Sequence, residues 1–231
     1  MAFGPLVVVL PFGGSSRQTL EALTDEVVLP KERRPLGKSE VRSIEYFGGR
    51  AALALAFREL GLSGTKVAPD PVWGYLSTND SKGIYTNLSH TEQVAVAVVA
   101  DSPIGVDIEN VERDVTRVLK RIATDEEASY HQGRQLTVCG GEVPDAVALW
   151  SAKEALSKAL GLGMRYGLQD FLIALEGPMP FRATSLRPGP FSLTQPAVTL
   201  FRWDRYVISV AAERDILDRG VTLRSLLLSS L

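Results

Sequence analysis

The chain has 231 residues, of which 45% are hydrophobic and 23% are charged, so it can bury a sizeable core as one large domain or two small ones. The formal net charge of −2 excludes a general basic field that would recruit nucleic acid. The single cysteine, Cys139, excludes an internal disulfide framework and a multi-cysteine zinc site.

The predicted elements of the first half are, in order, a strand at 6–12, a helix at 39–60, an irregular connection at 64–82, and strands at 84–88 and 93–99. The first apolar run has no basic residue before it and is too short to span a bilayer, which favours a buried strand over a signal segment. We expect Ser39 to cap the helix and Gly61 to end it. The segment Ser89–Glu92 joins the last two strands.

The predicted elements of the second half are a strand at 104–109, a helical segment at 114–132 with a fresh capped turn at Thr124, a polar loop at 133–143, a helix at 145–160 stopped by Gly161 and Gly163, strands at 171–175, 198–203 and 206–212 around a Pro/Gly-rich loop at 177–196, and an apolar tail at 222–231. The Ala/Leu-rich helix end at 50–61 resembles that at 153–161. This echo suggests two α+β halves that pack face to face, with a cleft between them.

Two short stretches bring acidic and basic side chains onto shared faces. On the predicted central strand, Asp107 and Glu109 are two residues apart, so both carboxylates leave the same face. On the later helix, Trp150, Glu154 and Lys158 are spaced four apart and share one face. Singly, such pairs are usually an exposed strand face or an ordinary helix ion pair. Together, three carboxylates and an ammonium suit a hard divalent cation and a phosphate.

Further candidates for anion binding lie in the first half. Ser89 and His90 follow a strand, where loops often carry function, although a lone histidine is more often structural. Arg42 and Arg50 are eight residues apart and share roughly one helix face. Their guanidinium groups suit phosphate oxygens, but a solvated surface position is equally favoured for each.

Other features lack this context. The basic run at 31–38 is typical of a solvated segment that can meet an acidic ligand or partner. His131 is expected on the surface. Residues 13–17 follow a strand but lack the Gly-Lys-Ser/Thr of a phosphate-binding loop, and neither a dinucleotide-binding glycine motif nor a Gly-x-Ser-x-Gly elbow is present in the sequence.

Residues 105–109 (GVDIE) and 150–158 (WSAKEALSK) together resemble the paired signature of the 4′-phosphopantetheinyl transferases. The length of the chain, residues 87–91 (NLSHT) and the doubled layout are similar to the surfactin-synthetase-activating type rather than the short trimeric type. Residues 42–52 (RSIEYFGGRAA) and 73–75 (WGY) resemble the enterobactin-synthetase branch.

The resemblance implies an α+β fold of two similar halves, related by a pseudo-twofold, with the active site in the cleft between them. The N-terminal half would be 1–103, and the C-terminal half, 104–231, would carry the metal site. It also implies that coenzyme A binds there as its Mg²⁺ complex and is the co-substrate. A serine of a carrier protein then attacks the β-phosphorus, and adenosine 3′,5′-bisphosphate leaves.

The resemblance also assigns roles to the acidic and basic residues of the second half. Asp107, Glu109 and Glu154 would ligate Mg²⁺, and Mn²⁺ also accepts such oxygen ligands. Lys158 would hold the pyrophosphate and stabilise charge in the transition state. Glu154 would take the serine proton directly or through a metal-bound water, and the sequence leaves both routes open.

In the first half, the resemblance places Ser89 and His90 at the 3′-phosphate side of the nucleotide, with Arg50 and Arg42 in support. The chain departs from the family at a Lys-Pro pair that often precedes the Ser-His segment. Only the lysine, Lys82, is present, and no proline follows it.

The expected partners are coenzyme A and apo acyl or peptidyl carrier protein domains, without nucleic acid or a membrane. The polar segment at 111–143 is a plausible docking surface for an acidic carrier helix, from the family layout. We expect a cytoplasmic monomer. Two other functions stay open at this point: a non-catalytic protein that binds coenzyme A or a carrier, and a Mg²⁺-dependent nucleotide pyrophosphatase.

Overall fold

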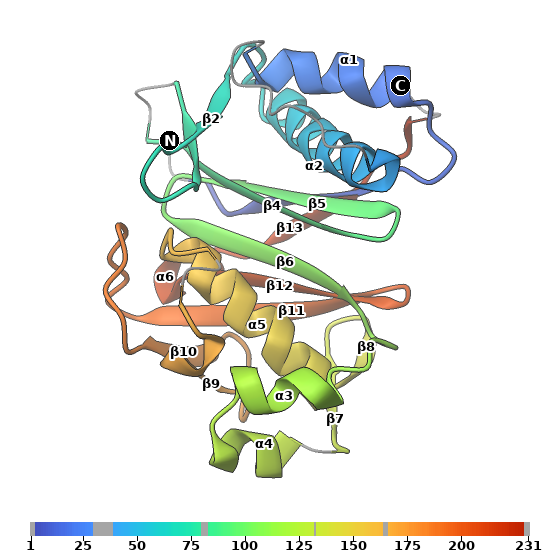
Figure 1. The fold of residues 1–231 in the computed structure, drawn as a ribbon. Helices are drawn as coiled ribbons and strands as arrows, with labels where there is room; N and C mark the ends of the chain where they lie inside the picture. The colour runs from blue at the N-terminus through green and yellow to red at the C-terminus, as the bar shows by residue number, and fades with distance from the viewer. Residues whose placement is uncertain (1–2, 30–38, 80–82, 132, 164–165, 229–231) are drawn as a thin grey trace. The chain divides into compact units, whose positions relative to one another are not determined.

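The computed structural model describes all residues except 1–2, 30–38, 80–82, 132, 164–165 and 229–231, which Figure 1 draws in grey. The basic run at 31–38 lies outside the described residues, as does Lys82. The chain divides into two compact units: Met1–Ser102 with Arg219–Leu231, and Pro103–Asp218. Both units combine helices with strands, which confirms the predicted α+β class. None of the described helices is both long enough and apolar enough to cross a membrane.

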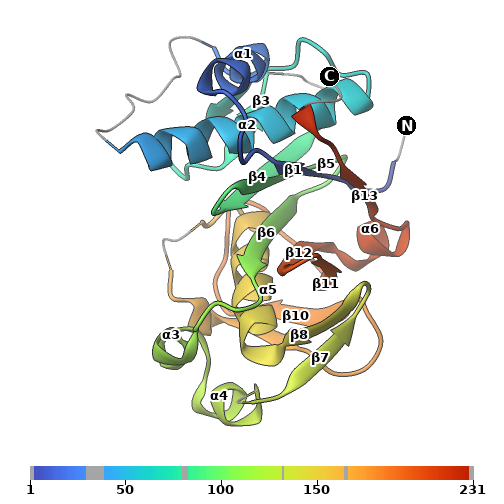
Figure 2. The same cartoon turned by 90° about the vertical axis from the view of Figure 1, so that its right-hand side faces the viewer.

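The first unit, in its described residues, contains a four-stranded sheet, a two-stranded ribbon and two helices. Its elements are β1 (Leu6–Pro11), α1 (Arg17–Val27), α2 (Glu40–Glu59), β2 (Val67–Pro69), β3 (Leu76–Thr78), β4 (Tyr85–Thr91), β5 (Val94–Ala100) and β13 (Thr222–Ser225). The sheet order is β13-β1-β5-β4, in which β1 runs parallel to β13 and antiparallel to β5 (Figure 2). The predicted apolar tail therefore supplies a strand to the sheet of the first unit.

Helix α2 packs closely on this sheet because two glycines lie on its buried face. Ser39 caps its first turn as predicted. A Cβ at Gly48 would come within 2.6 Å of the Phe12 ring, and one at Gly49 would come within 3.0 Å of Leu88. Both positions therefore favour a residue without a side chain. The close contact of Gly49 with Leu88 brings this part of α2 against β4.

The second unit contains a five-stranded sheet that packs against one long helix. Its elements are β6 (Ile104–Asn110), α3 (Thr116–Ile122), α4 (Asp125–His131), β7 (Gln135–Val138), β8 (Gly141–Pro144), α5 (Asp145–Ala159), the 3₁₀ turn η2 (Leu168–Asp170), β9 (Phe171–Ala174), β10 (Phe181–Ser185), β11 (Pro196–Trp203), β12 (Tyr206–Glu213) and α6 (Arg214–Asp218). The sheet order is β6-β12-β11-β10-β9, and every neighbouring pair is antiparallel. Strand β6 therefore forms one edge.

The two units share an order of elements and a helix ending. In each, a strand is followed by a long helix and a later hairpin, and the first strand pairs antiparallel with the second strand of that hairpin, β1 with β5 and β6 with β12. The predicted stops Gly61 and Gly161 are both left-handed, with φ of 67° and 73°. The next N–H groups, of Leu62 and Leu162, bond to carbonyls five residues back at 2.8 and 2.9 Å. This is the Schellman pattern, and it explains the sequence echo between the two helix ends.

Some predicted connections were wrong. The loop expected at 133–143 contains the hairpin of β7 and β8, and the Pro/Gly-rich loop at 177–196 contains β10. These strands have only four or five residues each, too few to give a clear two-residue alternation. The predicted turn at Ser89–Glu92 belongs mostly to β4, which continues through Thr91 before the chain reverses at Glu92 (φ 49°).

Candidate active site

Strand β6 turns alternate side chains toward helix α5. The even-numbered residues Val106 and Ile108 point the other way, and both are buried. On the α5 side, a Cβ at position 105 would lie 2.0 Å from the Ala155 carbonyl oxygen, so Gly105 permits the close approach of strand and helix. The result is two carboxylates pressed against α5, with Asp107 1% exposed and Glu109 6% exposed.

Lys158 joins this acidic pair from α5. Its Nζ donates to Asp107 Oδ1 at 2.8 Å and to the Val106 carbonyl at 3.1 Å, and it lies 3.8 Å from Glu154 Oε2. Burial lowers the pKa of Lys158, but the carboxylates of Asp107 and Glu154 outweigh burial and raise it above its ordinary value. The ammonium group is therefore charged at neutral pH.

Glu154 is the most strongly perturbed acid of the group. Burial, followed by the charge of Asp107, raises its pKa from 4.5 to about 7, although Lys158 opposes the rise. Burial and Asp107 also raise the pKa of Glu109. The structure therefore places Asp107, Glu109, Glu154 and Lys158 near one another within one unit, and the charge of Asp107 adds to burial in raising the pKa of Glu109 and Glu154.

Two side chains hold Glu109 in place. Trp150 Nε1 donates to Glu109 Oε1 at 2.8 Å, and the Arg113 guanidinium donates to the same oxygen. Arg113 also lies 4.7 Å from the centre of the Trp150 ring, within cation–π range. Sequence reasoning placed Trp150 correctly on the face of Glu154 but missed Arg113, because its spacing of four from Glu109 has no meaning outside a helix.

A buried ion pair connects the α3–α4 segment to α5. Lys153 is fully buried, and its Nζ donates to Glu127 Oε2 at 2.7 Å and to the Ile122 carbonyl at 2.8 Å. Burial lowers the pKa of Lys153, and Glu127 opposes this. Glu127 also forms the predicted capping box with Thr124. These contacts hold Lys153, the residue next to Glu154, in place. The sequence alone did not reveal this role of Lys153.

His131 was predicted to lie on the surface, and this was wrong. It is 3% exposed, and its Nδ1 lies 3.3 Å from Asp145 Oδ2. The contact connects the end of α4 to the first turn of α5. A single histidine in a polar segment has no periodic signal, so only the tertiary packing of these two helices could reveal its burial.

The donor set has the right chemistry for a hard divalent ion but is not gathered around one point. Within the described part of the chain, no three His, Cys, Asp or Glu side chains converge closely enough to hold a metal ion. Lys158 and Arg113 instead supply the positive charge beside Asp107 and Glu109. The residues fit such an ion, because a dication would stabilise the ionised carboxylates that burial and, second to it, the charge of Asp107 disfavour at Glu154.

The predicted nucleotide ligands lie in the first unit. Ser89 is half-buried and His90 is exposed, and they follow each other on β4. Arg50 donates from Nη1 to the Tyr46 carbonyl at 3.3 Å, and its guanidinium lies 3.6 Å from the centre of the Tyr46 ring. Arg42 is exposed in the first turn of α2.

Arg50 and Ser89 flank the same contact between α2 and β4. Arg50 follows Gly49, and Ser89 follows Leu88, and these preceding residues approach each other closely. Arg42 lies two helical turns earlier. Successive side chains on a strand leave opposite faces, so Ser89 does not share the face on which Leu88 meets α2. The contact between α2 and β4 therefore does not by itself bring Ser89, Arg50 and Arg42 together.

Comparison with known proteins agrees with this geometry. A family model described as the 4′-phosphopantetheinyl transferase superfamily matches residues 103–211, which run from the start of β6 into β12. Enterobactin synthase component D of Escherichia coli O157:H7 is 30% identical over 176 residues, which cover 71% of this chain and 80% of that protein. A 4′-phosphopantetheinyl transferase of Bacillus pumilus is 34% identical over 92 residues, covering 39% and 37%. One of Aneurinibacillus migulanus is 27% identical over 90 residues, covering 39% and 37%.

The match is continuous across the helices and strands that hold Asp107, Glu109, Glu154 and Lys158 together. The chain belongs to the 4′-phosphopantetheinyl transferase superfamily.

Proposed function

We propose that this enzyme transfers the 4′-phosphopantetheine arm of coenzyme A to a serine of an apo carrier protein and releases adenosine 3′,5′-bisphosphate. This is the reaction of its superfamily. The observation that carries the proposal for this chain is the acidic group of buried Asp107 and Glu109 with partly buried Glu154, in which the Lys158 ammonium contacts Asp107 and Glu154. A protein that only bound coenzyme A would have no need of so costly a cluster of like charges.

Asp107, Glu109 and Glu154 would hold the divalent ion, with Mg²⁺ as the expected metal and Mn²⁺ also acceptable. When bound, the ion neutralises the pyrophosphate and polarises its phosphoryl oxygens. Trp150 and Arg113 both donate to one oxygen of Glu109, so they orient this carboxylate.

Lys158 and Glu154 are the residues that act on the reacting groups. The Lys158 ammonium binds pyrophosphate oxygens and stabilises the negative charge of the departing nucleotide. As the serine oxygen forms its bond to the β-phosphorus, the bond from that phosphorus to the bridging oxygen breaks. Glu154 would take the serine proton. Its raised pKa of about 7 belongs to the metal-free protein, in which burial and the charge of Asp107 favour the protonated carboxyl.

The nucleotide would be held by the first unit. Ser89 and His90 would contact the 3′-phosphate side, with Arg50 and Arg42 in support. We propose that the halves 1–103 and 104–231, apart from the C-terminal strand β13 that joins the sheet of the first unit, are related by a pseudo-twofold and enclose coenzyme A in a cleft between them. The shared order of strand, helix and hairpin in the two units supports this arrangement.

The carrier would dock on the segment 111–143, and the cations of α3 support this. Arg117, Lys120 and Arg121 are exposed on this helix and suit an acidic partner. Reversing both later charges (Lys120→Glu with Arg121→Glu) should raise KM for an acidic carrier about tenfold at low salt and leave KM for coenzyme A within about twofold. Arg224→Glu, at another exposed position, is the matched control. An unchanged KM for the carrier would contradict this docking surface.

We propose that the enzyme acts as a monomer in the cytoplasm, on free coenzyme A and on acyl or peptidyl carrier domains. The net charge of −2 supports a function without nucleic acid, and the repeat of one helix-and-hairpin unit within one chain supports the monomer.

The test is to mix the protein with coenzyme A, Mg²⁺ and a panel of apo carriers and to weigh each carrier. A carrier that gains one phosphopantetheine supports the transferase. Saturable binding of coenzyme A without any product would instead indicate a binding protein. Release of adenosine bisphosphate in the absence of a carrier would indicate a pyrophosphatase.

A further inference from the structure

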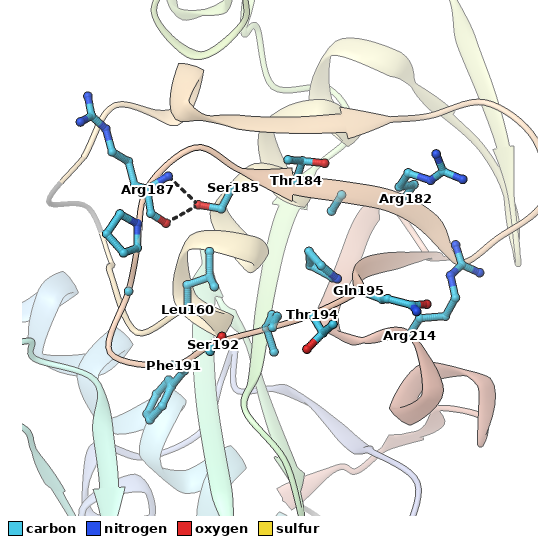
Figure 3. Close-up of a pocket in the computed structure, with 15 residues that line it drawn as sticks. Leu160, Arg182, Thr184, Ser185, Arg187, Phe191, Ser192, Thr194, Gln195 and Arg214 are labelled. Atoms are coloured by element: carbon cyan, nitrogen blue, oxygen red, sulfur yellow. Dashed lines mark hydrogen bonds between the residues drawn. The ribbon is translucent and has the colours of Figure 1, made fainter.

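A cavity of about 850 Å³ in the second unit shares no lining residue with the acidic group described above. It lies between strand β10 and the loop at 186–196 (Figure 3). The loop is anchored at both ends. The N–H of Leu186 donates to the Asp170 carbonyl at 2.9 Å, and the N–H of Thr194 donates to the Glu213 carboxylate at 2.8 Å. The cavity is therefore a fixed part of the fold.

Two arginines project at one end of this cavity. Arg182 comes from β10, and Arg214 comes from the start of α6. Arg214 Nη2 donates to the Pro180 carbonyl at 2.7 Å, so its guanidinium reaches the chain two residues before Arg182. Figure 3 shows both guanidinium groups pointing to the same end, on the side of Gln195, whereas Arg187 lies at the opposite end.

The two arginines at this end form no ion pair with the described residues around them. Within the described part of the chain, the Arg182 side chain has no hydrogen bond or ion pair, and Arg214 contacts only a carbonyl. The Glu213 carboxylate accepts from the backbone N–H groups of Thr194 and Gln195 rather than from either arginine, so its single negative charge offsets only one of the two positive charges.

The other charged groups near the cavity do not change this balance. Glu176 lines a neighbouring cavity together with Arg182, but the two form no ion pair in the described structure. At the opposite end, Arg187 is already paired with Asp170 at 3.1 Å. The excess charge therefore belongs to Arg182 and Arg214.

We propose that this end of the cavity binds a phosphate group, with Arg182 and Arg214 as its charged ligands. Guanidinium groups match phosphate oxygens with two parallel hydrogen bonds, and a phosphate would supply the acceptors that the described residues do not offer to Arg182. The Gln195 amide and the Thr184 and Thr194 hydroxyls line the same cavity and can complete the hydrogen bonds. The volume suits a small phosphorylated molecule. The site is additional to the proposed transferase reaction and does not depend on it.

The test is a titration of the full chain with inorganic phosphate at constant ionic strength, followed residue by residue by NMR. We expect saturable shifts of the Gln195 side-chain amide and of the Thr184 and Thr194 backbone amides. The amides of Ser89 and His90 report separately on the proposed nucleotide site. Loss of the shifts at one place and not the other therefore distinguishes failure of this proposal from failure of the proposed function.

Arg182→Gln is the decisive variant, because the side chain is exposed and has no contact whose loss would unfold the protein. It should weaken phosphate binding about tenfold or more, since a charge-assisted hydrogen bond contributes that much. Arg187→Gln, in the same cavity, should bind within about twofold of the wild type, because Asp170 already pairs with that arginine. The melting temperatures of both variants check the fold.

Glycerol phosphate, titrated in parallel, distinguishes free phosphate from a phosphorylated metabolite. Tighter binding of the ester supports a metabolite site, and tighter binding of inorganic phosphate supports a phosphate site. Shifts that never saturate, or an Arg182→Gln protein that titrates like the wild type, would overturn the proposal.

Discussion

Replacing Glu154 by Gln should stabilise the metal-free protein while it removes the proposed general base. The pKa of Glu154 rises from 4.5 to about 7, first because the carboxyl is buried and then because Asp107 lies near it. The folded state therefore holds this proton more tightly than the unfolded state. Stability contributed by the protonated form is lost as pH rises between about 4.5 and about 7. Above that range, ionised Glu154 costs the folded protein about 3 kcal/mol, at about 1.4 kcal/mol for each pKa unit.

Glutamine has a similar shape and cannot ionise, so Glu154→Gln should escape this loss. Lys158 keeps its 2.8 Å contact with Asp107 in the variant, so no buried charge is left alone. The advantage of the variant over the wild type should be under about 1 kcal/mol at pH 5 and approach about 3 kcal/mol at pH 8. Glu176→Gln, at an exposed position of the same unit, should show no such trend.

The measurement is unfolding by urea in the presence of a chelator, at both pH values, followed by tryptophan fluorescence. Trp150 and Trp203 both lie in the second unit and report on its unfolding. Adding Mg²⁺ at pH 8 should stabilise the wild type and should have little effect on the variant, because a ligand that binds the folded state stabilises it. A difference in stability that is the same at pH 5 and pH 8 would refute this account of Glu154.

Three further substitutions test the assigned roles. Asp107→Ala should lower kcat at least about a hundredfold, because it removes a proposed metal ligand that is also the partner of Lys158. Near-wild-type turnover would contradict the assignment of Asp107 to the metal. Trp150→Phe removes the N–H that donates to Glu109 but keeps an aromatic ring in the core. It should raise the Mg²⁺ concentration for half-maximal activity about tenfold. An unchanged Mg²⁺ dependence would show that Trp150 only packs. His90→Ala should raise KM for coenzyme A about tenfold with kcat within about threefold, as measured by steady-state kinetics, and a fall in kcat alone would remove His90 from nucleotide binding.

The acidic group could be predicted from local geometry because periodicity fixes it. A spacing of two on a strand and of four on a helix places side chains on one face whatever the rest of the fold does. The structure confirms that Asp107 and Glu109 face α5 and that Lys158 reaches back to Asp107. The two glycine stops, Gly61 and Gly161, were predicted for the same local reason.

The supporting residues could not be predicted because their contacts are tertiary. Arg113 reaches Glu109 from an irregular segment, and Lys153 pairs with Glu127 from another helix. Neither contact follows a period that the sequence displays. Short strands such as β10 likewise depend on their neighbours in the sheet, because five residues supply too little alternation of their own.

The most direct test of the central claim is the intact mass of an apo carrier after incubation with the enzyme, coenzyme A and Mg²⁺. The account predicts that a carrier gains one phosphopantetheine on its serine, and that omitting Mg²⁺ or using Glu154→Gln abolishes the gain. If no carrier of a broad panel gains mass while coenzyme A binds saturably, or if Glu154→Gln modifies the carrier as fast as the wild type, the buried acidic group is not the centre of a transferase.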